Sequence, residues 1–456
     1  MTKKRLFAAL TAVAMVAGTF VGAASAKAAD RTVTVWSPYS GGNLKTWNAA
    51  LKRIEAANPG LKIESVGSVD MAKSLAAINA GNGPDISVAN GAGNLGWFCG
   101  TGAWQKLNRF IAGPQGIDMS KTFVKAAYDY TVSNGNRCGL PTAGSETFGF
   151  YYNKDLLKSA GYSAAPETTK ELLDMSIKLT KFNSDGSIKV AGFVPWAGYY
   201  GFEMDAMWLG LMFGAKWYSA SGQPAFSSDP KWIKAFNWQK EFIAKVYGGG
   251  DFATGSSKLA KFVAARGDEW GAGHDFITGR VAMKLDADWM GMMYCDPDGW
   301  NLNPCTKPAV NFGVAAFPVD ASISSTNYGS GLVGGGVMGI SKGSKNVKDA
   351  WIVLKGLATD LTFAIDFAND NGAVPVLKAA LNSKKITYPA FYQAFYDIAL
   401  NPKSGYHTLK NTGEHLEDTE IFTFMSAWQM GSISDLKSGL KSVNSKVSSI
   451  LTRNSN

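Results

Sequence analysis

The feature that most constrains the fold is an alternation of strand and helix patterns after residue 30. Residues 32–36 (TVTVW) alternate and are rich in β-branched side chains, which indicates a strand. Apolar residues then recur at helical spacing up to the stop signal at 58–60 (NPG). A second strand pattern covers 61–66, a second helix pattern ends near Gly81, and a third strand begins at Pro84. This order is typical of a parallel, doubly wound α/β sheet.

The length and charge of the chain narrow the possible classes further. A chain of 456 residues exceeds what one hydrophobic core accommodates, so we expect two domains. Without the four basic residues in the first 28 positions, 41 basic residues face 36 acidic ones, a net charge of +5. The basic residues are scattered among acids and form no run of five, so we expect no nucleic-acid partner.

The first thirty residues have the layout of an export signal. A basic start is followed by an apolar stretch from Leu6 to Ala24 and by small residues at A-x-A spacing. Cleavage after Ala26 and cleavage after Ala28 both fit, and an uncleaved anchor is the alternative. We therefore expect an exported protein that is periplasmic or extracellular and associated with the cell envelope.

Four cysteines follow the signal: Cys99, Cys138, Cys295 and Cys305. An even number in an exported chain predicts disulfides. Three pairings are possible, and we expect Cys99 with Cys138 and Cys295 with Cys305. The second pair closes a short loop rich in Pro, Asp, Asn and Gly, which has little structure of its own. Because the chain contains only three histidines, we expect no metal site.

Motifs for catalysis are weak. The chain contains no Walker A sequence and no G-x-S-x-G elbow. The glycines of 329–334 fit G-x-G-x-x-G but lack a strand before them and a helix within them, which indicates close backbone approach and no dinucleotide cofactor. Two of the three acids Glu146, Asp286 and Asp288 could act as a glycosidase pair. Carboxylates also accept hydrogen bonds from sugar hydroxyls without catalysis, so hydrolysis is the alternative to binding.

The tryptophans fall into two groups. Those at helical spacing, such as Trp47 and Trp208, are predicted to lie in the core. Trp196, Trp289 and Trp428 have polar or small neighbours instead. An aromatic ring stacks on the apolar face of a pyranose while nearby carboxylates and amides bind its hydroxyls, so these residues suit a sugar site. Taken singly, core packing explains each of the three equally well.

Several segments resemble the extracellular solute-binding proteins of carbohydrate ABC importers, the group that includes maltose-binding protein. The most specific segments are 151–161 (YYNKDLLKSAG) and 340–346 (ISKGSKN). They overlap longer matches at 139–160 and 335–350. These occur in the family's order with further matches at 33–36, 56–66, 76–88, 276–289, 312–319 and 372–378. The resemblance therefore covers nearly the whole chain after the signal.

The resemblance implies a type II periplasmic-binding-protein fold, an α/β architecture of two lobes. Each lobe would be a doubly wound sheet flanked by helices, with the ligand cleft between the lobes. The expected parts are a signal peptide at 1–28, an N-terminal lobe of 29–143 plus 331–374, and a C-terminal lobe of 144–330 plus 375–456. The lobes would be joined by three crossovers whose glycines suit a hinge.

The resemblance also implies a function. The chain would be a monomeric receptor, not an enzyme, that captures a carbohydrate and delivers it to the transmembrane permease subunits of an importer. It would need no cofactor. The alternatives are a secreted glycoside hydrolase and a surface sugar-binding protein without an importer, and a polyol or sugar phosphate could replace the sugar.

Site residues are carried over position by position. Glu146 falls on an acidic ligand-binding position before the segment YYNK, and Trp289 falls on the stacking Trp that ends 282–289. In this architecture the loops after the first and third strands face the cleft. The other ligand-binding candidates are Tyr39, Asn43, Asn90, Trp196, Tyr199, Asp288, Gly335 and Trp428.

Overall fold

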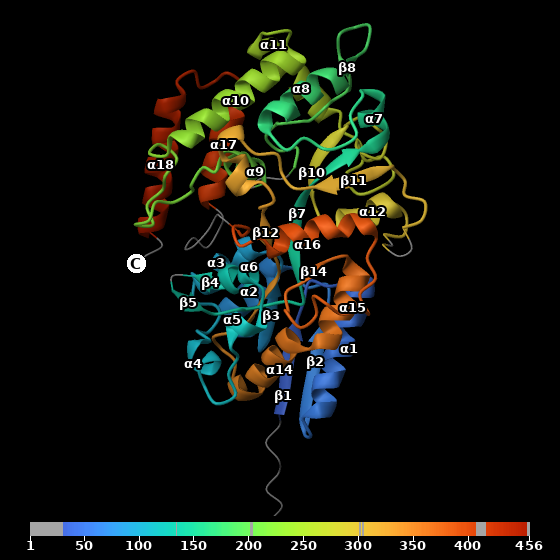
Figure 1. Cartoon of the computed structure of the whole chain (residues 1–456). Coiled ribbons are helices and arrows are strands. Elements are labelled where there is room, and N and C mark those ends of the chain that lie inside the picture. Colours follow the sequence, from blue (N-terminus) through green and yellow to red (C-terminus); the bar gives the residue numbers. More distant parts are fainter. Residues whose placement is uncertain are drawn as a thin grey trace, which may run out of the picture.

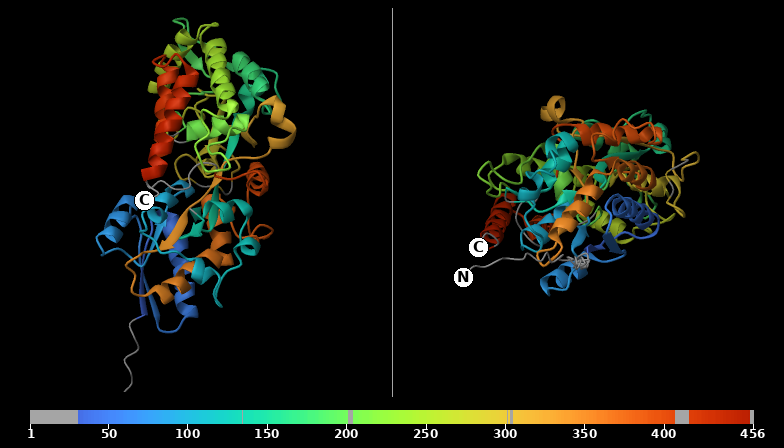
Figure 2. Two further views of the ribbon diagram at one scale, coloured as in Figure 1. Left: turned by 90° about the vertical axis from the view of Figure 1, so that its left-hand side faces the viewer. Right: turned by 90° about the horizontal axis from the view of Figure 1, so that it is seen from below.

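The computed structural model describes residues 31–453 except 134, 201–203, 301, 303–304 and 407–415. Over these residues the chain forms two α/β lobes stacked end to end, as Figure 1 shows and Figure 2 repeats from the side and from below. The predicted signal peptide lies outside the described residues. Within the described part of the chain, no helix has both the length and the apolar character needed to cross a membrane.

The first lobe is built on the strand and helix alternation that the sequence predicts. Its first elements are β1 (Arg31–Trp36), α1 (Gly41–Ala57), β2 (Leu61–Val66), α2 (Met71–Asn79) and β3 (Ile86–Ala89). Strand β1 pairs in parallel with both β2 and β3. The sheet is completed by two antiparallel pairings from distant segments, β13 (Val337–Ile340) on β3 and β6 (Leu140–Pro141) on β13. The sheet order is therefore β2-β1-β3-β13-β6.

Helices cover this sheet and enclose one hydrophobic core. The long helices α14 (Val347–Thr359) and α15 (Leu361–Asn371) pack beside α1 (Figure 1). Short elements follow β3: η1 (Ala92–Asn94), α3 (Leu95–Cys99), α4 (Asn108–Ile111), α5 (Met119–Thr122), α6 (Lys125–Tyr130), β4 (Val132–Ser133) and β5 (Asn136–Arg137). The predicted disulfide between Cys99 and Cys138 is confirmed, and it ties the end of α3 to the segment after β5.

The second lobe is arranged around β7 (Gly144–Asn153). Strands β10 (Met283–Ala287) and β11 (Phe312–Ala315) flank β7, and both pairings are antiparallel. The two-lobed α/β fold is thus as predicted, whereas the strand direction in this sheet differs from a doubly wound parallel sheet. The reason is topological: β7 runs away from the first lobe, and β10 and β11 return toward it (Figure 1).

Helices surround the sheet of the second lobe. They are α7 (Lys154–Ser159), α8 (Thr169–Leu179), α9 (Met204–Phe213), α10 (Pro230–Tyr247), α11 (Phe252–Ala264), α12 (Met290–Cys295), α16 (Gln393–Leu400), α17 (Leu416–Gln429) and α18 (Leu436–Arg453). The smaller elements are β8 (Lys181–Phe182), β9 (Ile188–Val190), η2 (Ala321–Ile323), α13 (Ser324–Asn327) and η3 (Ala390–Tyr392). The predicted disulfide between Cys295 and Cys305 is also confirmed, and it closes the loop after α12.

Three segments meet where the lobes join. The first half of β7 pairs antiparallel with β12 (Val333–Gly334) and with β14 (Val374–Pro375). The lobe boundaries in the sequence stay a prediction. Val376, Leu377 and Ala380 pack in the core of the first lobe, which supports a last boundary somewhat after residue 375.

Candidate ligand-binding site

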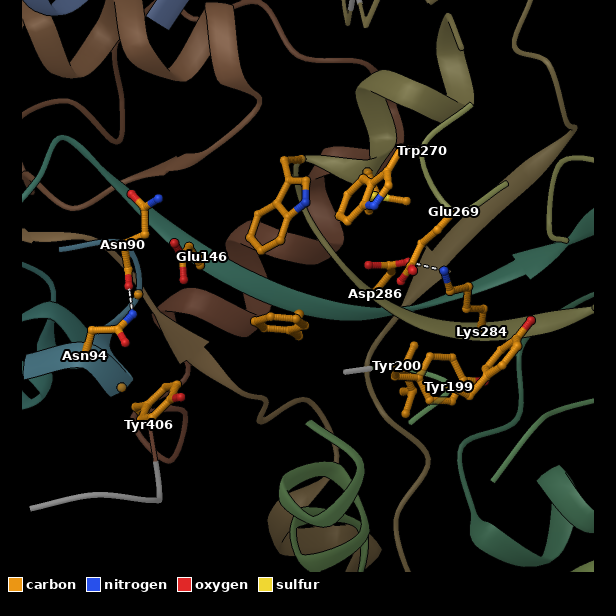
Figure 3. Close-up of a pocket in the computed structure, with 16 residues that line it drawn as sticks. Asn90, Asn94, Glu146, Tyr199, Tyr200, Glu269, Trp270, Lys284, Asp286 and Tyr406 are labelled. Atoms are coloured by element: carbon orange, nitrogen blue, oxygen red, sulfur yellow. Dashed lines mark hydrogen bonds and ion pairs between the residues drawn. The ribbon is translucent and has the colours of Figure 1, made fainter. Parts of the chain in front are cut away.

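A cavity of about 390 Å³ is lined by residues from both lobes and from the strand that joins them. This volume lies within the range of small-molecule sites. Figure 3 shows how the side chains surround it. The lining residues are Asn90, Gly91, Gly93, Asn94, Glu146, Phe148, Tyr199, Tyr200, Glu269, Trp270, Lys284, Leu285, Asp286, Trp289, Met290 and Tyr406.

The first lobe contributes the loop that follows β3. Because this loop leaves the carboxyl end of a parallel strand, it lies where α/β sheets bind ligands. Gly91 has a φ of +73°, a left-handed conformation that favours glycine. A Cβ at Gly91 would lie 3.5 Å from Oε2 of Glu146, so the loop passes close to that carboxylate. The Asn94 side-chain amide donates to the Asn90 carbonyl oxygen, which shapes the loop (Figure 3).

The joining strand β7 contributes Glu146, whose backbone lies opposite Gly334 of β12. Two tyrosines lie near its carboxylate. Burial raises the pKa of Tyr130 well above its ordinary value, and the negative charge of Glu146 raises it further. Burial likewise raises the pKa of Tyr39, with a smaller contribution from Glu146. Both hydroxyls therefore stay protonated beside the acid.

The second lobe contributes aromatic rings. Trp289 precedes α12 as its N-cap residue, and its ring meets Phe148 edge-on at a centroid distance of 5.7 Å. Tyr199 and Tyr200 pack edge-to-face at 4.8 Å. Such rings offer broad apolar faces beside polar groups, which is the combination that carbohydrate recognition requires.

A polar cluster lies among these rings. Lys284 on β10 is buried, and its Nζ lies 2.7 Å from Oδ2 of Asp286 and 2.7 Å from Nε2 of His274. The Tyr294 hydroxyl donates to Oδ2 of Asp286 at 3.1 Å. The lysine charge is thus matched by an aspartate. With Glu146 and Glu269 the described lining holds three carboxylates against one ammonium, so the cavity is net negative.

We predict that His274 makes the protein sensitive to acid. Burial, with the nearby Lys284 ammonium, lowers the pKa of His274 from 6.5 to about 2. Below pH 6.5 the imidazole of His274 binds a proton in the unfolded chain but not in the folded protein. The contribution of His274 therefore lowers the free energy of unfolding by about 1.4 kcal/mol for each unit by which the pH decreases. Above pH 6.5 this loss is absent. Urea unfolding of wild type and of His274→Gln between pH 7.5 and 4.5 measures it, and parallel pH profiles would contradict the prediction.

The structure places the sequence-predicted site residues in two groups. Asn90, Glu146, Tyr199 and Trp289 line the cavity. The others lie outside the lining: Tyr39, Asn43, Trp196, Asp288, Gly335 and Trp428. That the first group binds ligand stays a prediction.

Packing explains why the second group lies elsewhere. Trp196 and Trp428 are 7% and 5% exposed in the hydrophobic core of the second lobe. Tyr39 packs on Trp47 and Phe367 in the first lobe. Gly335 allows close approach, since a Cβ there would lie 2.6 Å from the Tyr130 hydroxyl oxygen.

Asp288 has a positioning role. It is fully buried, and its carboxylate accepts the backbone N–H groups of Thr147 and Trp289 at 3.1 and 3.0 Å. Burial raises the pKa of Asp288 well above its ordinary value, although these N–H groups oppose the shift. Asp288 therefore fixes β7 and the start of α12, which carry Glu146 and Trp289.

Several lining residues were not predicted as ligand-binding. Lys284 and Asp286 alternate with Leu285 within 282–289, and this alternation in a matched segment could have identified them. Trp270 is 58% exposed, but no local pattern distinguishes it from the other tryptophans. We found no sequence signal for Tyr406. Among the residues that the structure describes, no group of His, Cys, Asp and Glu could hold a metal ion.

Comparison with known proteins identifies the class. The family model "Bacterial extracellular solute-binding protein" matches residues 49–393, three quarters of the chain. The chain belongs to this family of bacterial extracellular solute-binding proteins. The resemblance inferred from the sequence is thereby confirmed, and the chain is a binding protein of the ABC-importer class, not an enzyme.

Relatives of this solute-binding protein bind different solutes. The sn-glycerol-3-phosphate-binding periplasmic protein UgpB of Salmonella typhimurium is 25% identical over 363 residues, which are 76% of this chain and 75% of that protein. A maltotriose-binding protein of Pyrococcus abyssi is 22% identical over 377 residues, 82% of this chain and 73% of that protein.

Solved structures of the same fold include sugar complexes. The protein CpMnBP1 with bound mannotriose is 25% identical with a TM-score of 0.70, covering 91% of this chain and 99% of that one. The sugar-binding protein MalE of Xanthomonas citri is 18% identical with a TM-score of 0.69, and the match covers 92% of this chain and 98% of that chain. This similarity shows the shared fold. The two-lobed fold is thus the arrangement expected of the family.

Proposed function

We propose that this solute-binding protein captures an oligosaccharide in the cavity between its lobes and delivers it to the transmembrane subunits of an ABC importer. The observation that supports this most is the composition of the lining, which combines the aromatic rings of Trp289 and Tyr199 with the polar side chains of Glu146 and Asn90. Aromatic faces suit the apolar faces of sugar rings, and carboxylate and amide groups suit their hydroxyls.

The charge of the lining favours a neutral ligand over a phosphate. Three carboxylates face one ammonium among the described lining residues, and that ammonium, on Lys284, is already paired with Asp286. A phosphate would be repelled by the carboxylates and would find no arginine among the described lining residues. An uncharged sugar requires no counter-charge.

The three crossovers between the lobes support a hinge mechanism. Two lobes connected by paired strand ends can rotate about them, and ligand contacts from both lobes favour the closed state. We further propose that the protein is exported, acts outside the cytoplasmic membrane and is monomeric.

Calorimetric titration of the chain without its signal peptide tests the ligand class. We expect one-to-one binding of mannotriose or maltotriose with micromolar Kd and no detectable binding of sn-glycerol 3-phosphate, because of the net negative lining. Binding of the phosphate with rejection of all sugars would contradict the proposal.

Two further readouts separate the alternatives. Recovery of intact sugar after the titration is expected, and cleavage products would favour a glycoside hydrolase. Sugar-stimulated ATP hydrolysis by vesicles that contain the partner importer is expected, and its absence would favour a surface receptor without a transporter.

A further inference from the structure

A stacked pair of indoles extends the aromatic side of the cavity toward solvent. Trp270 lines the cavity and is nevertheless 58% exposed. Its ring stacks on Trp300 with centroids 6.1 Å apart and an interplanar angle of 27°. The two adjacent indoles form a continuous aromatic surface beside the cavity, and grouped exposed apolar side chains mark binding surfaces.

The segment that carries Trp270 is held in place by carboxylates. The backbone N–H of Trp270 donates to Oδ1 of Asp268 at 3.0 Å, and that of Gly267 donates to Oδ1 of Asp275 at 3.1 Å. Asp275 is buried, and it also accepts the hydroxyl of Tyr199 at 3.0 Å. Because Tyr199 lines the cavity, one carboxylate positions both an inner ring and the turn that presents Trp270.

The partner ring, Trp300, lies in the loop that the Cys295–Cys305 disulfide closes. Trp300 has a φ of +52°, which is rare for a bulky residue and persists only where the surroundings impose it. The backbone N–H of Trp300 donates to the Asp296 carbonyl oxygen at 2.8 Å, and the side chain of Leu302 is buried in a hydrophobic cluster of the second lobe. The disulfide at Cys295 and the buried side chain of Leu302 flank Trp300 in the sequence, and they restrain Trp300 against Trp270.

We propose that Trp270 and Trp300 form an outer carbohydrate subsite that the Cys295–Cys305 disulfide positions, so that the ligand spans at least two sugar rings. This inference rests on the proposed function. The inner ring contacts Trp289 and Glu146, and the next ring stacks on the exposed surface of Trp270. Trp300 is a positioning residue that supports Trp270 from its other side.

Calorimetric titration of Trp270→Ala against sugars of increasing length tests the outer subsite. The probes are mannose, mannobiose and mannotriose, together with glucose, maltose and maltotriose. We expect the Kd for the trisaccharide that wild type binds to rise about tenfold in the variant, while the Kd for its monosaccharide changes less than twofold. Equal losses at every length, no loss at any length, or wild-type binding of monosaccharides alone would overturn the subsite. Wild-type binding of none of the six sugars would instead overturn the proposed function, and the subsite with it.

Three further variants complete the design. Phe182→Ala removes a 43% exposed ring on β8 at the far end of the second lobe, and it should leave every Kd unchanged (Figure 1). Trp270→Phe should retain most of the trisaccharide affinity. The double variant Cys295→Ser/Cys305→Ser should lose trisaccharide affinity more than monosaccharide affinity, as Trp270→Ala does. Unchanged affinity at all lengths in the double variant would overturn the positioning role of the disulfide.

Discussion

Trp289→Ala should raise the Kd for the bound oligosaccharide about a hundredfold, the largest effect on binding that we expect from one substitution. Trp289 lines the cavity at the start of α12 and packs edge-on against Phe148. Its removal takes away an aromatic surface of the cavity, and aromatic anchors that a ligand covers contribute about 2 to 4 kcal/mol to binding. Titration calorimetry of the purified variant measures the change.

Two variants serve as controls for Trp289→Ala. Trp289→Phe keeps an aromatic face, so its Kd should rise less than tenfold. Trp196→Phe changes a tryptophan that the sequence suggested as a stacking residue and that the structure buries in the core of the second lobe. Trp196→Phe should lower the melting temperature without changing Kd. An unaltered Kd in a folded Trp289→Ala variant would contradict the placement of the site.

Gly372→Ala should lower the free energy of unfolding by about 3 kcal/mol. Gly372 ends α15 with a φ of +54°, and a left-handed conformation costs alanine about 1 kcal/mol relative to glycine. A Cβ there would also overlap the hydroxyl oxygen of buried Tyr392, and overpacking of this kind costs about 1 to 3 kcal/mol. That hydroxyl donates to the carbonyl oxygens of Gly372 and Asp288, so it links the third crossover to the segment between β10 and α12.

Gly431→Ala separates the two causes. Gly431 follows α17 with a φ of +73°, and nothing lies within 4 Å of a Cβ built there. This variant incurs only the cost of the left-handed backbone conformation, so its free energy of unfolding should fall by about 1 kcal/mol. Urea unfolding of both variants beside wild type measures the difference, and equal losses would show that the contact with Tyr392 is unimportant.

The parts of the fold that the sequence predicted are those set by local patterns. The strands at 32–36 and 61–66 and the helix between them follow from alternation, from helical spacing and from the stop signal at 58–60, and the structure confirms them. The disulfide of Cys295 and Cys305 was predicted for the same reason, because a loop of this composition has few other constraints.

The predicted residues that line the cavity are two in matched segments, one that follows a strand, and Tyr199, which lies in an aromatic segment beside Trp196. Glu146 and Trp289 were placed by the family resemblance, and Asn90 by its position after the third strand. Trp196 and Trp428 have polar or small neighbours that suit a sugar site, yet both are buried in the core of the second lobe. The residues next to a tryptophan in the sequence do not determine whether its side chain is buried, because burial depends on packing against segments that are distant in the sequence.

The sequence by itself determined the α/β class and the family and indicated the Cys295–Cys305 disulfide, since each depends on local pattern or residue type. Tertiary structure alone decided the antiparallel sheet around β7 and the meeting of Trp270 with Trp300. It also decided the pairing of Lys284 with Asp286 and the burial of Trp196. These features arise from contacts between segments far apart in the chain, and their free energy depends on geometry that local periodicity does not encode.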